Sequence, residues 1–182
     1  MRVTLIAVQS LDGFITRHDA PGVSFASVAD QSHFRTALRA FDCGVMGRAT
    51  YEQARTDGMP PPTPARRRVV LTRTPARHAA EAVPGVLEFT AAPPHAIVAR
   101  LRGEGCQACA LLDGAQIHSL FLAAGLVDEL WLTVEARLFG GGTPLLLART
   151  DTRLRLLAHE TLDDDVLLLK YAVCGAKDPE QK

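Results

Sequence analysis

The sequence predicts an α/β protein built on a mixed, mostly parallel sheet that is flanked by helices. Two observations lead to this fold class. Through the first two thirds of the chain, short apolar runs of strand length alternate with amphipathic runs of helix length, as in a parallel sheet with crossover helices. From Val127 onward, strand-like runs follow one another with no helix between them, which indicates antiparallel strands at one edge.

The elements of the alternating part follow from their periodicity. The apolar runs fit buried strands, whereas the mixed runs place their apolar residues on one helix face. Strands are expected at residues 3–8, 44–46, 68–72, 86–89 and 108–112, and helices at residues 28–41, from residue 48, at 95–102 and at 116–125. Residues 56–68 contain four prolines and a glycine, which excludes regular structure and marks an exposed loop.

The C-terminal part is predicted to form three strands, at residues 128–139, 153–162 and 165–173. No internal repeat and no long linker divides the chain. We therefore expect a single domain over residues 1–175, followed by a frayed polar tail at 176–182.

Composition argues against several classes of function. Twenty lysines and arginines balance twenty aspartates and glutamates, so the chain lacks the positive field that attracts nucleic acid or an anionic membrane. No run approaches the roughly 18 apolar residues of a membrane span, and the N-terminus lacks a signal-peptide pattern. We expect a cytoplasmic protein with a small-molecule substrate that binds neither nucleic acid nor a membrane.

Cysteines and histidines give no metal site by their spacing. Cys106 and Cys109 form one C-x-x-C pair without a second pair, and Cys109 begins an apolar strand, so a buried structural role is favoured over half a zinc site. Four cysteines in a chain of this length are expected to be reduced thiols.

Residues 43–53, CGVMGRATYEQ, join an apolar strand to a helix through Gly47. A helix that begins there has free backbone N–H groups at its N-terminus, where the helix dipole favours an anion. Gly47 would let a phosphate approach the backbone, Arg48 adds charged donors, and Thr50 can donate or cap. The stretch indicates phosphate binding, and a plain strand-to-helix turn with an exposed arginine is the alternative.

Further motifs occur in the order in which dihydrofolate reductase and its relatives carry them. They are LIAVQSLDGFI near the start, VMGRATYEQ, a proline-rich basic loop followed by RVVLTR, DGAQIHSLFLAAGLVDELWLTVEARLFGGGTPLL, and a terminal pair of strands. The chain thus resembles the dihydrofolate-reductase-like superfamily, which implies a three-layer fold. SLDGFI and the GLVDEL and LFGGG runs look more like the reductase domain of the riboflavin-biosynthesis deaminase-reductase, whereas LWLTVEARLFGGGTP also resembles dihydrofolate reductase.

The resemblance implies NADPH as the cofactor. In the family, the arginine and threonine of GRxT contact the NADPH phosphates, which implies this role for Arg48 and Thr50, with Gly47 giving access and Ala49 between them.

The strand VVLTR ends in the family where the adenosine 2′-phosphate binds. This implies that Thr72 and Arg73 contact that phosphate and that Leu71 lies beside the adenine or ribose. A cation and a hydroxyl at this place favour NADPH over NADH. The alternative for Arg73 is a solvated side chain in a turn before Pro75.

The segment LLDGAQIH matches the second cofactor loop of the family, a Gly-Gly pair that opens a helix beneath the pyrophosphate and nicotinamide. Asp113 replaces the first glycine, which adds steric demand and a negative charge near two phosphates. It could instead cap the helix by accepting from the N–H of Gln116. The residues implied on this side of the cofactor are Ala7, Asp113, Gly114, Ala115, Gln116, Ile117 and His118.

The substrate side needs a proton source if the acceptor is an imine. Asp30 precedes Phe34 by four residues, the spacing of the acid and an aromatic in the substrate helix of dihydrofolate reductase, and Thr133 resembles a strand threonine that contacts the same site. The resemblance therefore implies that Asp30 and Thr133 are the catalytic residues. An aspartate in a first helical turn is also commonly a cap or a dipole partner.

Two residues depart from the riboflavin-type pattern. Phe14 stands where those reductases usually carry a lysine, and Leu112 stands where they carry an acidic residue. Both changes remove groups that suit a polar ribityl-phosphate, so the sequence favours a more apolar or aromatic acceptor. The zinc signature of the deaminase domain is absent from the sequence.

Together these features predict an NADPH-dependent reductase that transfers hydride to a small, flat heterocyclic or carbonyl acceptor, similar to 5-amino-6-(5-phosphoribosylamino)uracil reductase. A true dihydrofolate reductase and a non-catalytic ligand-binding protein that kept the fold are the alternatives. The apolar strands after Val127 favour a homodimer, as riboflavin-type members often form.

Overall fold

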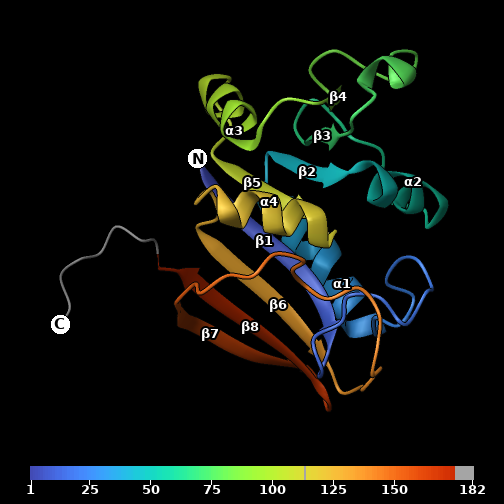
Figure 1. The fold of residues 1–182 in the computed structure, drawn as a ribbon, viewed down its shortest axis with the longest axis vertical. Helices are drawn as coiled ribbons and strands as arrows, with labels where there is room; N and C mark the ends of the chain where they lie inside the picture. The colour runs from blue at the N-terminus through green and yellow to red at the C-terminus, as the bar shows by residue number, and fades with distance from the viewer. Residues whose placement is uncertain (113, 175–182) are drawn as a thin grey trace.

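A computed structural model describes residues 1–112 and 114–174 of the protein. Its centre is an eight-stranded sheet with the order β4-β3-β2-β5-β1-β6-β8-β7 (Figure 1). The strands from β4 to β6 pair in parallel, whereas β8 pairs antiparallel with both β6 and β7. The predicted mixed sheet with an antiparallel C-terminal edge is therefore confirmed.

The helices and strands lie where the sequence patterns place them. The strands are β1 (Arg2–Ser10), β2 (Cys43–Gly47), β3 (Arg67–Leu71), β4 (Leu87–Thr90), β5 (Ala108–Leu112), β6 (Glu129–Glu135), β7 (Leu154–Asp163) and β8 (Val166–Val173). The helices are α1 (Val28–Ala37), α2 (Arg48–Thr56), α3 (Pro94–Gly103) and α4 (Ala115–Ala123), and short 3₁₀ turns occupy Leu38–Ala40 and Pro75–His78.

One predicted boundary is wrong, because the strand expected at residues 128–139 ends at Glu135. Beyond that residue the backbone is held by the connection that follows β1. The N–H of Leu11 donates to the carbonyl of Arg137 at 2.8 Å, and the Asp12 carboxylate accepts from the N–H groups of Phe139 and Gly140. The carbonyl of Arg137 and the N–H groups of Phe139 and Gly140 are thus bonded to Leu11 and Asp12, and they are not available for pairing with a neighbouring strand.

Two helices cover each face of the sheet, which confirms the layered architecture. Apolar residues of α3 and α4, such as Leu101 and Phe121, join one core cluster, and Tyr51 of α2 with Phe34 of α1 joins the other. In Figure 1, α4 crosses in front of β5 and β1 while α1 lies behind the sheet.

The adjacent strands β2 and β5 continue into helices on opposite faces of the sheet. Gly47 of β2 leads into α2, and β5 leads through Gly114 into α4. Open α/β sheets bind ligands at such a change of face, outside the carboxyl ends of the two strands, and we call this place between the two junctions the crevice.

Two further features of the sequence are visible in the fold. Among the helices of the described residues, none has the length and apolar character needed to cross a bilayer. Cys106 and Cys109 are buried as expected, and burial with the neighbouring Cys43 thiol raises the pKa of Cys106 to about 11.

Candidate active site

The junction between β2 and α2 has the geometry that the motif predicts. Gly47 is the last strand residue and also the N-cap of α2, with φ −80° and ψ 160° and no side-chain cap. Arg48 and Ala49 are exposed and Thr50 is half-buried. The N-terminus of α2 thus presents its backbone N–H groups at the carboxyl edge of the sheet.

The junction between β5 and α4 lies directly against the first one. A Cβ placed on Gly47 would lie 3.3 Å from Cγ1 of Ile117, and a Cβ on Gly114 would lie 3.2 Å from Oγ1 of Thr50. Gly114 has φ +115°, a conformation that side-chain-bearing residues rarely adopt. The structure therefore brings together Gly47, Thr50, Gly114 and Ile117, although they come from two separate motifs.

Arg48 is engaged by an acidic residue of its own helix. Its Nη1 lies 2.7 Å from Oε1 and 2.6 Å from Oε2 of Glu52, and both side chains are about half exposed. A phosphate that uses Arg48 must compete with this pair.

The end of β3 lies beside the β2 junction. Leu71 pairs in register with Gly47, which places Thr72 and Arg73 next to the start of α2. The N–H of Thr72 donates to the carbonyl of Thr90, and its hydroxyl accepts from the N–H of Thr74 at 3.3 Å. The Arg73 side chain is exposed.

On the other side of the crevice, Ala7 and the first turns of α4 are mostly buried. Ala7 follows the register pair of Ile6 with Leu112, so it lies next to the end of β5. Ala115 and Ile117 are buried, whereas Gln116 is exposed. Asp113 lies outside the described residues, so its predicted effect on the cofactor stays a prediction.

His118 is the fourth residue of α4, and its side chain is fully buried. Its Nδ1 lies 3.1 Å from the carbonyl oxygen of Leu145, which makes Nδ1–H the donor, and burial lowers its pKa to about 4. In the described part of the chain, Nε2 has no hydrogen-bond partner. The imidazole is thus a neutral ring with a free acceptor nitrogen at neutral pH.

Asp30 lies in the first turn of α1, where it is only 7% exposed. Ser27 caps this helix, because its hydroxyl accepts from the N–H of Asp30 at 3.1 Å. Burial raises the pKa of Asp30, and a hydrogen bond with Thr133 opposes this effect. The structure therefore brings the two predicted catalytic residues together across the interface between α1 and β6.

Glu135 is a third member of this group that sequence reasoning missed. It is 4% exposed, its charge contributes to the raised pKa of Asp30, and its Oε1 accepts from the N–H of Ser27 at 2.7 Å. The available signal was its spacing, since a strand residue two positions after Thr133 shares its face of the sheet.

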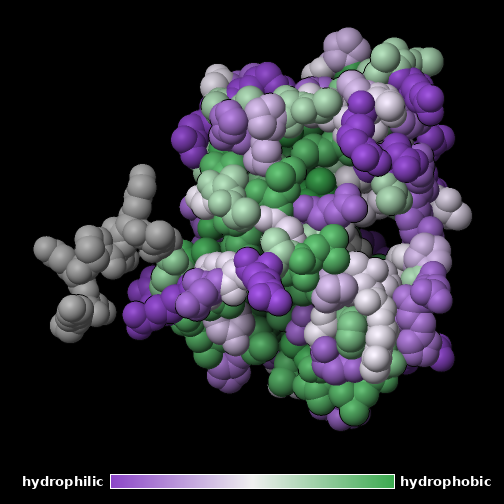
Figure 2. All heavy atoms as spheres, in the orientation of Figure 1, coloured by the Kyte–Doolittle hydropathy of each residue, from purple (hydrophilic) through white to green (hydrophobic). Residues whose placement is uncertain are grey.

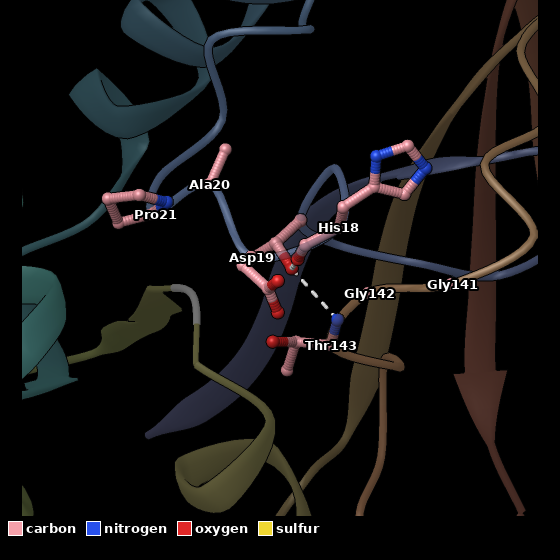
Figure 3. Close-up of a pocket in the computed structure, with 8 residues that line it drawn as sticks. His18, Asp19, Ala20, Pro21, Gly141, Gly142 and Thr143 are labelled. Atoms are coloured by element: carbon pink, nitrogen blue, oxygen red, sulfur yellow. Dashed lines mark hydrogen bonds between the residues drawn. The ribbon is translucent and has the colours of Figure 1, made fainter.

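A cavity of about 520 Å³ opens between the connection after β1 and the connection after β6. Figure 3 shows His18 and Asp19 on one loop and Gly141, Gly142 and Thr143 on the other. Asp30 and Thr133 do not line the cavity themselves. The first loop, however, continues through residues 22–27 into α1, so one wall of the cavity and Asp30 lie on the same stretch of chain between β1 and β2.

Hydrogen bonds join the connection after β1 to the connection after β6 near this cavity. The N–H of Thr143 donates to Oγ1 of Thr16 at 2.8 Å, as the dashed line in Figure 3 marks, and Nε2 of His18 lies 2.9 Å from the carbonyl oxygen of Phe139. The Asp12 carboxylate accepts from the Ser10 hydroxyl at 2.6 Å, which lowers its pKa. Asp12 therefore joins the two loops, because the same carboxylate also accepts from the N–H groups of Phe139 and Gly140.

Comparison with known sequences identifies one family. A model of the RibD C-terminal domain matches residues 1–168 of the chain. Among curated proteins, no sequence matches it.

Solved structures with the same fold come from several organisms. A pyrimidine reductase-like protein from Corynebacterium diphtheriae superposes with a TM-score of 0.72 at 16% identity, over 95% of this chain and 92% of that chain. A diaminohydroxyphosphoribosylaminopyrimidine deaminase/5-amino-6-(5-phosphoribosylamino)uracil reductase from Thermotoga maritima gives 0.75 at 16% identity, over 95% of this chain and 56% of that one.

A dihydrofolate reductase from Enterococcus faecalis, in complex with NADP(H), gives a TM-score of 0.67 at 18% identity, over 94% of this chain and 96% of that chain. At these identities the likeness concerns the fold, and it confirms the predicted dihydrofolate-reductase-like architecture.

Proposed function

The chain belongs to the RibD C-terminal domain family, a reductase family of riboflavin biosynthesis, and from this premise we propose that it is an NADPH-dependent reductase. It transfers hydride to a small, flat heterocyclic or carbonyl acceptor, in a reaction that resembles that of 5-amino-6-(5-phosphoribosylamino)uracil reductase. The observation that carries the proposal is the contact between the β2–α2 and β5–α4 junctions, because it places two helix N-termini at one crevice.

The residues of the crevice fit a dinucleotide. Side chains at Gly47 and Gly114 would press against Ile117 and Thr50, so the two glycines let the junctions pack closely together. Two helix N-termini held side by side in this way suit a pyrophosphate, which carries more than one negative charge. On the same side, in helix α4, Nε2 of His118 is a buried nitrogen that has no hydrogen-bond partner among the described residues. These features support the assignment of the crevice as the cofactor site.

In this proposal each end of the cofactor has its own set of residues. Arg48, Ala49 and Thr50 hold the pyrophosphate together with the N-terminus of α2, and Thr72 and Arg73 hold the adenosine 2′-phosphate, with Leu71 beside the adenine or ribose. The residues near the nicotinamide are Ala7, Asp113, Gly114, Ala115, Gln116, Ile117 and His118. When bound, NADPH supplies the hydride.

The substrate side supplies the proton. Because burial raises the pKa of Asp30, its carboxyl group keeps a proton at higher pH than an exposed aspartate does. Thr133 orients this carboxyl through its hydroxyl. Asp30 is therefore the proposed proton donor, and Thr133 is its partner from the sheet.

Calorimetric titration of the purified protein with NADPH and NADH tests the cofactor assignment. We expect NADPH to bind more tightly, and Arg73→Ala to reduce its affinity toward that of NADH, by roughly 10-fold or more, because a charged hydrogen bond is lost. Absence of binding by both nucleotides would instead favour a ligand-binding protein that kept the fold.

Turnover assays then distinguish a riboflavin-type reductase from a dihydrofolate reductase. NADPH consumption is measured with 5-amino-6-(5-phosphoribosylamino)uracil and with dihydrofolate as acceptors. Activity with dihydrofolate alone would favour a dihydrofolate reductase. Turnover of the pyrimidine supports the riboflavin-type reading.

We also propose that the protein forms a homodimer through β7. This ten-residue strand is the last in the sheet order, and Leu154, Leu156 and Leu157 on it are 39%, 50% and 48% exposed. Figure 2 shows hydrophobic surface over the lower part of the molecule, where Figure 1 places β7 and β8. An unpaired apolar edge strand is a ready partner for a second copy.

Light scattering coupled to size exclusion tests this interface. The wild-type protein is expected to elute with the mass of a dimer, and Leu156→Lys with that of a monomer. Leu138→Lys, at an exposed leucine outside β7, is the matched control. A monomeric wild type would reject the dimer.

A further inference from the structure

Two buried acidic residues meet at Ser27, where α1 begins beside β6. The N–H of Ser27 donates to Oε1 of Glu135 at 2.7 Å, and the Ser27 hydroxyl accepts from the N–H of Asp30 at 3.1 Å. Asp30 is 7% exposed and Glu135 is 4% exposed, and the charge of Glu135 acts on Asp30. Two neighbouring carboxylates with so little water cannot easily both be ionised. The charge on Glu135 therefore adds to burial in favouring the protonated form of Asp30.

The contacts of Glu135 favour its charged form. Its Oε1 accepts from the backbone N–H of Ser27 at 2.7 Å, and Ser27 is the N-cap of α1. A hydrogen bond from an N–H group and the positive end of a helix dipole both stabilise a carboxylate. Glu135 is therefore the member of the pair that is expected to carry the charge.

The surroundings of Asp30 favour its neutral form. Burial and the Glu135 charge raise its pKa, whereas the Thr133 hydroxyl and the N-terminus of α1, in whose first turn Asp30 lies, oppose them. The other charged groups near α1 form a separate cluster, in which His33 is influenced by Lys170 and Glu160 of β8 and β7. Among the charged groups of the described residues, Glu135 is thus the one that acts on Asp30.

We propose that Glu135 is a positioning residue that keeps the Asp30 carboxyl group protonated, so that Asp30 can deliver this proton to the acceptor. The inference rests on the proposed reductase function and adds to it a residue that controls the proton donor.

The proton balance of the step is simple. The acceptor gains a hydride at carbon from the nicotinamide cofactor and a proton at its nitrogen or oxygen from Asp30. The O–H bond of the carboxyl breaks as the new N–H or O–H bond forms. The Asp30 carboxylate that remains then takes a proton from solvent, while Glu135 stays ionised throughout.

NMR titration of the protein without nucleotide, labelled at the side-chain carboxyl carbon of aspartate, tests the proposal. Asp30→Asn identifies the Asp30 signal by its loss. Relative to wild type, Glu135→Gln is expected to shift the Asp30 midpoint to lower pH, and Thr133→Val to shift it to higher pH. Glu129→Gln, on the same strand but paired with Arg2, is the matched control and should leave the midpoint in place.

An unchanged or higher Asp30 midpoint in Glu135→Gln would overturn the proposal. If that variant does not fold, Glu135→Asp replaces it, because the shorter side chain draws the carboxylate back toward β6 and should shift the Asp30 midpoint to lower pH by a smaller amount. An unchanged or higher midpoint in that variant would also overturn the proposal. Neither titration needs cofactor or substrate, so failure of the reductase assignment would appear separately, in the nucleotide calorimetry.

Discussion

Helices α1 and α4 both begin at the carboxyl edge of the sheet, on opposite faces, and each buries one titratable side chain. Asp30 lies in the first turn of α1 on the proposed substrate side, and His118 lies near the start of α4 on the proposed cofactor side. Both are buried, yet their hydrogen bonds differ. The Asp30 carboxyl has Thr133 and a neighbouring carboxylate, whereas the His118 ring has one backbone carbonyl.

The comparison shows how burial shifts the pKa values of an acid and of a base in opposite directions. Burial disfavours the charged form of any side chain, so it raises the pKa of Asp30 and lowers that of His118. The carboxyl thus keeps a proton that it can give away. The imidazole, in contrast, stays neutral and leaves the phosphate side of the crevice without an added positive charge.

The largest expected effect is on turnover, and it concerns Asp30. Asp30→Asn keeps the shape of the side chain but removes its acidic proton, so kcat should fall by about 10²–10⁴-fold, as for the loss of a general acid. NADPH affinity, measured by calorimetry, should stay at the wild-type value because Asp30 lies on the substrate side. Wild-type turnover in this variant would contradict the assignment of the proton donor.

The next effect concerns His118 and the pH dependence of folding. The unfolded chain binds a proton at this residue below its ordinary pKa of 6.5, whereas the folded protein does so only near its lowered pKa of about 4. The unfolded state therefore binds more protons between these values, and stability falls as the pH decreases through this window. The pKa difference corresponds to about 3 kcal/mol in free energy of unfolding.

Urea denaturation of His118→Phe between pH 7 and pH 4 measures this contribution. The variant should lose less stability over this range than wild type, even if the unpaired Leu145 carbonyl makes it less stable at every pH. His95→Gln, at an exposed helical position, is the control and should follow the wild-type curve. Parallel curves for wild type and His118→Phe would show that the ring is not held neutral by burial.

The contribution of Asp30 to the free energy of unfolding should change with pH in the opposite direction to that of His118. A folded pKa raised above the ordinary 3.8 means that its contribution to stability is fully present below pH 3.8 and is lost as the pH rises through the folded value. Asp30→Asn cannot lose a proton, so its stability relative to wild type should increase with pH and then level off. A relative stability that decreases with pH would mean that Asp30 is stabilised as a carboxylate.

The sequence predicted the parts of the site that depend on neighbouring residues. Gly47 to Thr50 follow from a strand that runs into a helix, whereas the place of Gly114 at the cofactor was implied by the family resemblance. Asp30 and Thr133 were predicted from the family resemblance, and the structure places them together.

The parts that the sequence did not predict depend on contacts between distant segments. Glu135 matters because its strand face meets the N-terminus of α1, at Ser27, more than a hundred residues earlier in the chain. Asp12 likewise ends β6 early through bonds to Phe139 and Gly140. Periodicity gives the face on which a residue lies, but it does not say which element covers that face.

The smallest expected effect concerns the exposed cofactor side, where Arg48 is paired with Glu52. An exposed ion pair between residues one helical turn apart contributes little, on the order of 0.5 kcal/mol, so a phosphate can displace Glu52 at a modest cost. Glu52→Gln removes this competition and a negative charge near the phosphates, and NADPH should bind about 2–5-fold more tightly in calorimetry.

Glu104→Gln, which breaks an exposed pair at the start of β3, should have no effect on affinity. Weaker NADPH binding by Glu52→Gln would mean that Glu52 positions Arg48 for the phosphate, and the ion pair would then belong to the binding site as a whole.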